Sequence, residues 1–343
     1  MIQSTFTKII SSQPSYKHIY SALLIALILV AIGSTLAGSY KLSLEEVWQG
    51  LLDPHSQSSS TLMLWEFRLP RLASALFVGA LFASSGFLLQ GLTRNPLADP
   101  SLIGVSQGAA LAVVLFVVLY PQELAGNRVW AAMSGACLAA FLIYTLTARK
   151  NQSASPLVFI LTGVGLSLFI TALTSTFLTY GQLENVMTAL SWLSGSLHRV
   201  SASDVSLLCI STLLILPSAW ILAHFLKAQQ LGNELAQSLG VPLKAIHSLQ
   251  LLVAVLAAAI ATAVVGPIGF IGLIAPHIAR KLTLGSPRHQ LILSMFVGAL
   301  LVSGADLLGR TLWAPVQIPA GIVSTLAGAP LLLILLFTNP KKP

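Results

Sequence analysis

LASALFVGALFASSGFLLQGL, residues 72–92, runs for 21 positions without a charged side chain. A helix needs about 20 mostly apolar residues to cross the hydrocarbon core of a bilayer. The run is continuous and lacks the alternating pattern of a strand in a membrane barrel. We therefore expect a transmembrane helix here, and this expectation sets how the rest of the chain is interpreted.

Nine other stretches have the same character, so we predict an all-α integral membrane protein whose residues 1–343 form a single transmembrane domain. The stretch 271–284 is short and rich in Gly and Pro, which leaves its boundaries open. The ten expected spans are 20–38, 72–92, 101–120, 129–148, 157–180, 204–226, 248–268, 271–284, 290–312 and 318–338.

The composition agrees with a membrane protein. The chain has 343 residues, of which 55% are hydrophobic and 8% charged, whereas soluble domains carry about 25% charged residues. This excludes a soluble enzyme and a disordered chain. The net charge of +8 comes from scattered Lys and Arg, so nucleic-acid binding is not expected. Cys137 and Cys209 lie in apolar runs, which predicts small buried hydrophobic residues.

The charges also predict an orientation. With ten spans and a cytoplasmic N-terminus, twelve of the eighteen Lys and Arg fall on the inner side, which then has a net charge of +10 against −2 outside. Inner loops collect basic residues, so both termini are expected in the cytoplasm. The first span follows Lys8 and Lys17 as a signal peptide would, but its length and the nine later spans favour a retained helix.

Ionisable side chains are almost absent from the centres of these spans. Asp204, Asp306 and Arg310 lie toward outer ends, and the last two share a helical face on which they can partly neutralise each other. This argues against a proton-driven carrier, which needs buried carboxylates. No Gly-Lys dipeptide and hence no P-loop occurs, so a nucleotide must bind another subunit. His277 has no partner at metal-ligand spacing, so no metal site is expected.

Three motifs are more specific than composition. The first combines Arg68-Leu-Pro-Arg71 with QGLTRNPLADP at 90–100, whose Asn-Pro and Asp-Pro pairs predict a tight reversal at the inner surface. The second is LGNELAQSLGV at 231–241. The third is GPIGFIGLIAPHIAR at 266–280, a broken stretch at membrane depth that continues to Arg310.

From about Trp65 to Leu336, these motifs in this order resemble the ten-span permeases of type II ABC importers for iron-siderophores, haem and cobalamin. The string RNPLADP looks most like the ferric-siderophore members, in particular the catecholate branch. The resemblance implies a transporter subunit and not an enzyme, which moves ferric siderophore across the bacterial inner membrane. Cobalamin or haem stays an alternative substrate, and an ATP-independent secondary carrier an alternative class.

The resemblance also implies partners. These are a cytoplasmic ABC ATPase dimer that binds ATP and Mg, a second permease subunit of the same or a related chain, and a periplasmic or lipid-anchored substrate-binding protein. The chain itself is expected to bind no cofactor. The sequence leaves open which siderophore is moved and whether the two permeases are identical.

The loop 227–247 matches the coupling helices that dock on the ATPase in this family. Its leucines recur every four residues and share one helical face, between two bracketing glycines. A short amphipathic helix suits a partner groove, although it could also lie on lipid. The residues implied for coupling are Leu231, Gly232, Glu234, Leu235, Ala236, Leu239 and Gly240.

On the outer side, Arg68, Arg71 and Arg310 match the family's arginines that meet glutamates of the binding protein. Arg forms bidentate contacts with carboxylates and so suits this role. The alternative is that each arginine snorkels to the membrane interface.

The gate and path can be assigned only by position. The loop before the fifth span matches the family's inner gate, and its small residues Ser153, Ala154 and Ser155 would suit a bulky ligand. Polar residues in the fifth span, Thr162, Ser167 and Thr171, are candidates for the path. Helix packing with local hydrogen bonds is the simpler interpretation of those three.

Overall fold

A computed structural model describes residues 16–38, 40–120, 127–147, 156–198, 200–283 and 285–337 of the chain. These residues contain helices and no strand. In chain order they form α2 (Tyr16–Leu36), α3 (Leu44–Leu52), α4 (Ser59–Leu62), η1 (Met63–Arg68), α5 (Leu69–Thr93), η2 (Pro100–Ile103), α6 (Val105–Leu119), α7 (Asn127–Thr147), α8 (Pro156–Tyr180), α9 (Leu183–Leu193), α10 (Ala202–Ala223), α11 (Leu226–Gln229), α12 (Asn233–Ser238), α13 (Leu243–Val265), α14 (Ile271–Leu282), α15 (Pro287–Thr311) and α16 (Ala320–Phe337).

Each of the ten expected spans corresponds to one of these helices, with ends that differ by a few residues. Within the described residues, seven helices are long and apolar enough to cross a membrane, and α6 and α16 are shorter apolar helices. The eighth expected span becomes α14, which has 12 residues and contains Pro276. It is short because the preceding residues 266–270 are not helical.

Besides the short α4 and η1, two longer helices lie where the sequence analysis expected only loops. Helix α3 begins with a capping box, in which the Ser43 hydroxyl accepts the Glu46 N–H and the Glu46 carboxylate accepts the Ser43 N–H. These hydrogen bonds from Ser43 lower the pKa of Glu46. Helix α9 is the second. A Ser-x-x-Glu sequence is a recognised helix start, so the signal for α3 was present in the chain.

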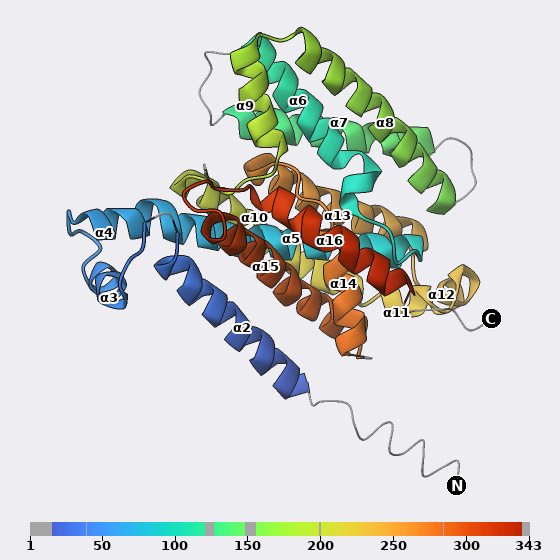
Figure 1. The fold of residues 1–343 in the computed structure, drawn as a ribbon. Coiled ribbons are helices and arrows are strands. Elements are labelled where there is room, and N and C mark those ends of the chain that lie inside the picture. Colours follow the sequence, from blue (N-terminus) through green and yellow to red (C-terminus); the bar gives the residue numbers. More distant parts are fainter. Residues whose placement is uncertain are drawn as a thin grey trace.

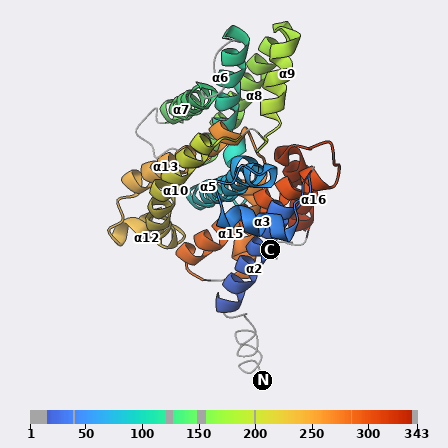
Figure 2. The ribbon, with the colours of Figure 1, turned by 90° about the vertical axis from the view of Figure 1, so that its left-hand side faces the viewer.

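Helix α5 is the centre of the bundle and packs against α10, α13, α14 and α15 (Figure 1). Helix α2 runs along the outside of α15, while α6, α7, α8 and α9 form a separate group that joins the rest mainly through α13. The turned view in Figure 2 shows the same division. We call the side that carries α11 and α12 the inner side, and the side that carries α3 and α4 the outer side.

Small residues allow the central helices to approach one another closely. At the crossing of α5 and α15, a Cβ on either Gly79 or Gly298 would collide with the backbone of the other. A Cβ on Gly86 of α5 would likewise collide with the backbone of Gly272 in α14, and a Cβ on Gly272 would collide with Pro100. Close approach through small residues is the usual way helices pack in a membrane, where burial of apolar surface adds little.

Large apolar side chains cover much of the outer surface of the bundle. Leu24, Ile28 and Leu29 on α2 are 50–63% exposed in the isolated chain, as lipid-facing residues would be. The sequence analysis was wrong about Cys137, which is exposed on α7, and Cys209 is only half-buried. An apolar run does not show which face of its helix is covered, and Cys137 lies on an uncovered face.

Candidate functional site

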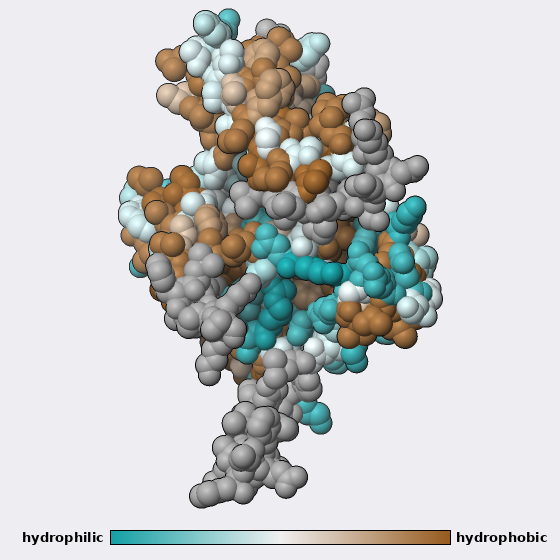
Figure 3. Space-filling model, turned by 90° about the vertical axis from the view of Figure 1, so that its right-hand side faces the viewer, coloured by the Kyte–Doolittle hydropathy of each residue, from teal (hydrophilic) through white to brown (hydrophobic). Residues whose placement is uncertain are grey.

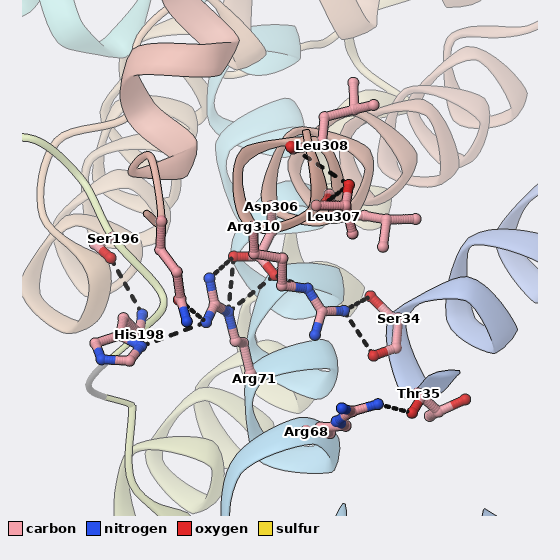
Figure 4. A network of polar contacts seen from close by, with 12 residues as sticks. Ser34, Thr35, Arg68, Arg71, Ser196, His198, Asp306, Leu307, Leu308 and Arg310 are labelled. Atoms are coloured by element: carbon pink, nitrogen blue, oxygen red, sulfur yellow. Dashed lines mark hydrogen bonds and ion pairs between the residues drawn. The ribbon is translucent and has the colours of Figure 1, made fainter. Parts of the chain in front are cut away.

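A cluster of charged residues joins the outer ends of α5 and α15 (Figure 4). The Nε of Arg71 donates to the two carboxylate oxygens of Asp306 at 2.9 and 3.0 Å, and its Nη2 lies 2.8 Å from Oδ1. Its Nη1 donates to Oε1 of Gln317 at 2.9 Å and lies 3.5 Å from Nδ1 of His198. Arg71 therefore links α5 to α15 and to the segments that precede α10 and α16.

Two further arginines complete this outer arginine cluster, which we define as Arg68, Arg71, Asp306 and Arg310. Arg310 lies one turn after Asp306, with Nε 3.5 Å from Oδ2, and its Nη2 donates to the carbonyl and hydroxyl oxygens of Ser34 at 2.6 and 2.7 Å. Arg68 donates to the backbone carbonyls of Thr35 and Tyr40. The two arginines thus hold the end of α2 against the bundle.

Burial of this cluster changes the expectation that its arginines meet a partner directly. Arg68 and Arg310 are each 5% exposed and are satisfied by groups of their own chain. The Arg71 side chain is 12% exposed and is held by Asp306. The structure therefore places all three together, but it does not present Arg68 and Arg310 as free surface cations. The sequence could not show this, because their partners lie on distant helices and on backbone.

A second polar cluster lies at the inner end of α5, where Gln90 is 3% exposed. Its Nε2 donates to the carbonyls of Ala98, Gly272 and Leu273, each at 3.2 Å, and its Oε1 accepts from Arg280. Gln90 therefore fastens both the connection after α5 and the first turn of α14 to α5.

Asp99 belongs to the same inner cluster and is 4% exposed. Its Oδ1 accepts the backbone N–H and the hydroxyl of Ser101 at 2.7 and 2.6 Å. Burial raises the pKa of Asp99, and hydrogen bonds from Ser101 and from the Leu273 N–H act in the opposite direction. Since Leu273 lies in the first turn of α14, the carboxylate also faces the positive end of that helix.

The turn after α5 lies within the stretch 90–100, where the sequence predicts a reversal. The Ala98 N–H donates to the carbonyl of Asn95 at 3.1 Å, and Pro96 and Leu97 are exposed. The chain then enters the bundle, where Pro100 packs against Gly272. Asp99 and Asp306 are buried, but Asp99 precedes η2 and Asp306 lies toward the outer end of α15, so neither lies at the centre of an expected span.

The expected coupling loop forms two short helices, α11 and α12, followed by the start of α13. Leu231, Leu235 and Leu239 are 57–66% exposed, whereas Ala236 is buried, so the three leucines form an exposed row. Gly232 and Gly240 have φ values of 107° and 81°, and they bracket α12 as predicted. The helix itself covers only Asn233–Ser238, so the outer two leucines flank it. Figure 3 shows hydrophilic residues gathered on the face on which this segment lies.

The candidate path residues on α8 bond within their own helix. Ser167 is 9% exposed and donates to the carbonyl of Val164 at 2.8 Å, while the exposed Thr171 donates to the carbonyl of Ser167 at 2.7 Å. Thr162 is half-buried. These contacts agree with the simpler interpretation of helix packing, and a role in the path stays a prediction. The expected gate residues Ser153, Ala154 and Ser155 lie outside the described residues.

Three non-helical connections meet near the outer half of the bundle. They lie between α9 and α10, between α13 and α14, and between α15 and α16. The Ser196 N–H donates to the carbonyl of Val265 at 2.8 Å, and the Gly321 N–H donates to the carbonyl of Gly195 at 2.8 Å. A shallow depression of about 360 Å³ lies beside them, lined in part by Ser194 and Pro267. The non-helical stretch 266–270 is thus covered by other parts of the chain.

Apolar helices that span a bilayer, short broken helices and buried charges at both ends define a multi-span helical membrane protein. Comparison with known families assigns it further. Residues 23–338 match the FecCD transport family, and the chain belongs to that family.

Several relatives share this family pattern over most of their length. The Fe(3+)-citrate import system permease protein YfmE of Bacillus subtilis is 36% identical, over 94% of this chain and 95% of the relative. The achromobactin transport system permease protein CbrC of Dickeya dadantii is 37% identical, over 92% and 90%. The ferric enterobactin transport system permease protein FepG of Escherichia coli is 33% identical, over 92% and 94%.

The fold also matches a solved structure. A metal-chelate type ABC transporter in an inward-facing conformation superposes with a TM-score of 0.82 at 28% identity, covering 95% of this chain and all of that chain. The ten-helix arrangement expected from the sequence is therefore the fold of a transporter of this kind.

Proposed function

We propose that the chain is the permease subunit of an ATP-driven importer that moves a ferric siderophore across the bacterial inner membrane. Family membership and the names of the relatives support the class of cargo. The observation that carries the proposal is the row of exposed leucines at 231, 235 and 239, on a segment too short to span a membrane. Such a row suits docking in the groove of a partner.

The charges support an orientation with the inner side in the cytoplasm. The inner loops hold most of the Lys and Arg of the chain, as the positive-inside rule requires. The segment 226–240 would then face a cytoplasmic ATPase dimer, which binds ATP and Mg. The outer arginine cluster would face a periplasmic or lipid-anchored binding protein, and a second permease subunit would complete the passage.

Each part of the chain has a physical task in this mechanism. The leucines of 231–239 receive the motion of the ATPase, and the non-helical stretches at 194–198 and 266–270 allow helices to tilt without breaking regular hydrogen bonds inside a span. On the outer side, the partly accessible Arg71 would meet a carboxylate of the binding protein. Arg68 and Arg310 would contribute indirectly, because their hydrogen bonds hold the end of α2 in place.

The cargo can be tested by growth. A strain that lacks this chain should fail to use at least one ferric siderophore as its only iron source, and the gene returned on a plasmid should restore growth. The relatives are named for citrate, achromobactin and enterobactin complexes, so these three are the probes, with cobalamin and haem as rival cargoes. A deletion strain that still grows on all three ferric complexes but loses growth on haem iron, or loses cobalamin-dependent growth, would replace the proposed substrate. The catecholate preference requires that growth on ferric enterobactin is lost.

Docking on an ATPase predicts a specific effect of Leu235, which is 57% exposed on α12. The change Leu235→Arg places a charge in the apolar contact, so we expect the amount of ATPase that co-purifies with the permease to fall about tenfold or more, as for a lost hot-spot residue. Quantitative immunoblotting of the solubilised complex measures this.

Leu52→Arg is the matched control, because Leu52 is 69% exposed on α3 at the outer side. It should leave the co-purified ATPase unchanged. Equal loss from both variants, or from neither, would contradict docking through α12. Absence of any ATPase with the unaltered chain would favour a secondary carrier.

A further inference from the structure

The inner end of α5 packs directly on the coupling segment. A Cβ on Gly91 would collide with the side chain of Leu226 in α11, which is 3% exposed. In the same helix, the Gln229 side chain is buried and donates to Oε1 of Gln250 in α13 at 3.1 Å. The coupling segment is therefore held against two long helices, and α5 is one of them.

Arg94 ends α5 in an uncommon backbone conformation. Its φ and ψ of 52° and 26° lie in the left-handed region, where glycine is the usual residue after a helix. A residue with a Cβ costs about 1 kcal/mol there, so its presence points to a contribution from the side chain. Within the described residues, Phe270 is the one other non-glycine residue with a positive φ.

The Arg94 side chain supplies that contribution. From its position at the end of α5, Nη2 donates to the backbone carbonyl of Gln229 at 2.9 Å and to Oδ1 of Asn233 at 2.6 Å. Gln229 is the last residue of α11 and Asn233 the first residue of α12. One guanidinium thus spans the junction between α11 and α12, on either side of the exposed Leu231.

The residues after Arg94 lead to the start of α14. Asn95 and Ala98 form a turn, and Gln90 donates to the carbonyls of Ala98, Gly272 and Leu273 and so ties this turn to α14. Arg94 therefore lies between the coupling segment on one side and, on the other, a connection anchored to the helix that follows the break at 266–270.

We propose that Arg94 is a positioning residue that fastens the coupling segment to α5, so that displacement of α11 and α12 is transmitted to residues 90–104. This inference rests on the proposed function. The charged donor is needed because the contact is small and its acceptors are a carbonyl and an amide, to which an ionised donor bonds about twice as strongly as a neutral one.

Hydrogen–deuterium exchange on the purified permease–ATPase complex tests this proposal, with Mg-ATP and vanadate as the probe and a nucleotide-free sample as the reference. In the unaltered protein we expect nucleotide to change exchange in both 226–240 and 90–104. In Arg94→Gly, which suits the left-handed conformation and lacks the guanidinium, the change at 226–240 should remain. The nucleotide-dependent change in exchange at 90–104 should become smaller by at least about fivefold, which is the lower limit of the usual coupling factor between two sites.

Three further variants sharpen the test. Arg94→Lys keeps the charge and should restore part of the response, because an ammonium can reach one acceptor at a time. Asn233→Ala should weaken the response, and combined with Arg94→Gly it should add nothing further. Lys281→Ala removes an exposed inner-side cation in the last turn of α14, outside the loop 227–247, and should leave the response intact.

The outcomes separate the two proposals. A normal nucleotide response at 90–104 in Arg94→Gly would overturn the role of Arg94, as would an equal rise of exchange in both nucleotide states with their difference preserved. If nucleotide leaves 226–240 unchanged in the unaltered complex, the proposed docking itself fails and this inference falls with it.

Discussion

Replacing Asp306 with alanine should destabilise the protein more than any other single change in the outer arginine cluster. Asp306 is the carboxylate that both Arg71 and Arg310 approach, and its side chain is 3% exposed. Without it, two positive charges remain in a buried site, and breaking a buried pair in this way costs about 3–5 kcal/mol. Thermal unfolding of the detergent-solubilised protein, followed by size-exclusion chromatography, measures the loss.

Asp204→Ala is the control for this prediction. Asp204 is also a carboxylate near the outer end of a helix, but it caps α10 with Ser201 at an exposed position. Loss of a cap costs about 1 kcal/mol, so its unfolding midpoint should fall much less. If both variants unfolded at the same temperature, Asp306 would contribute no more to the stability of the protein than an exposed capping residue, and the prediction would be wrong.

Gly86→Ala should disrupt the crossing of α5 and α14. The new methyl group would meet the backbone of Gly272, which has no side chain to move aside. Overpacking of a core costs about 1–3 kcal/mol, and backbone displacement puts the effect at the upper end. Helix α14 would also move away from Gln90 and Asp99, so we expect a large loss of folded protein in fluorescence-detected size-exclusion chromatography.

The chain provides a matched control in Gly304→Ala on α15, where nothing lies within 4 Å of the added Cβ. Alanine favours a helix over glycine by about 0.5–1 kcal/mol, so this variant should be as stable as the parent or more so. The prediction for Gly86 fails if its alanine variant behaves like that of Gly304.

The helices themselves could be predicted from the sequence, because each expected span is a run of apolar residues and its length is set by the thickness of a bilayer. Helix α14 was the difficult case. Its 12 residues are shorter than a span, and the physical reason is the non-helical stretch 266–270 before it. Gly266 and Pro267 indicated the break, and the expected start at residue 271 is where α14 begins.

The candidate sites were predicted less completely. The leucine row at 231–239 has a period of four, so it could be found from spacing alone, and it is exposed. The pairing of Arg310 with Asp306 could also be predicted from spacing, but the partner of Arg71 could not, because Arg71 meets Asp306 from 235 positions away. Gln90 and Asp99 were noticed only as part of a turn motif. Gln90 bonds backbone carbonyls of α14 that lie more than 180 positions away, so spacing could not reveal its role.

The long separation between the partners in the outer arginine cluster has a consequence for how the protein is made. Arg68 and Arg71 leave the ribosome long before Asp306, and at about 5–20 residues per second the interval is roughly 10–50 s. During that time Arg71 lies at the end of a completed apolar helix without its carboxylate partner, Asp306. The positive charge at the outer end of α5 is therefore neutralised only when α15 enters the membrane. Insertion of the permease thus includes a late step in which an ion pair forms between the first and last thirds of the chain.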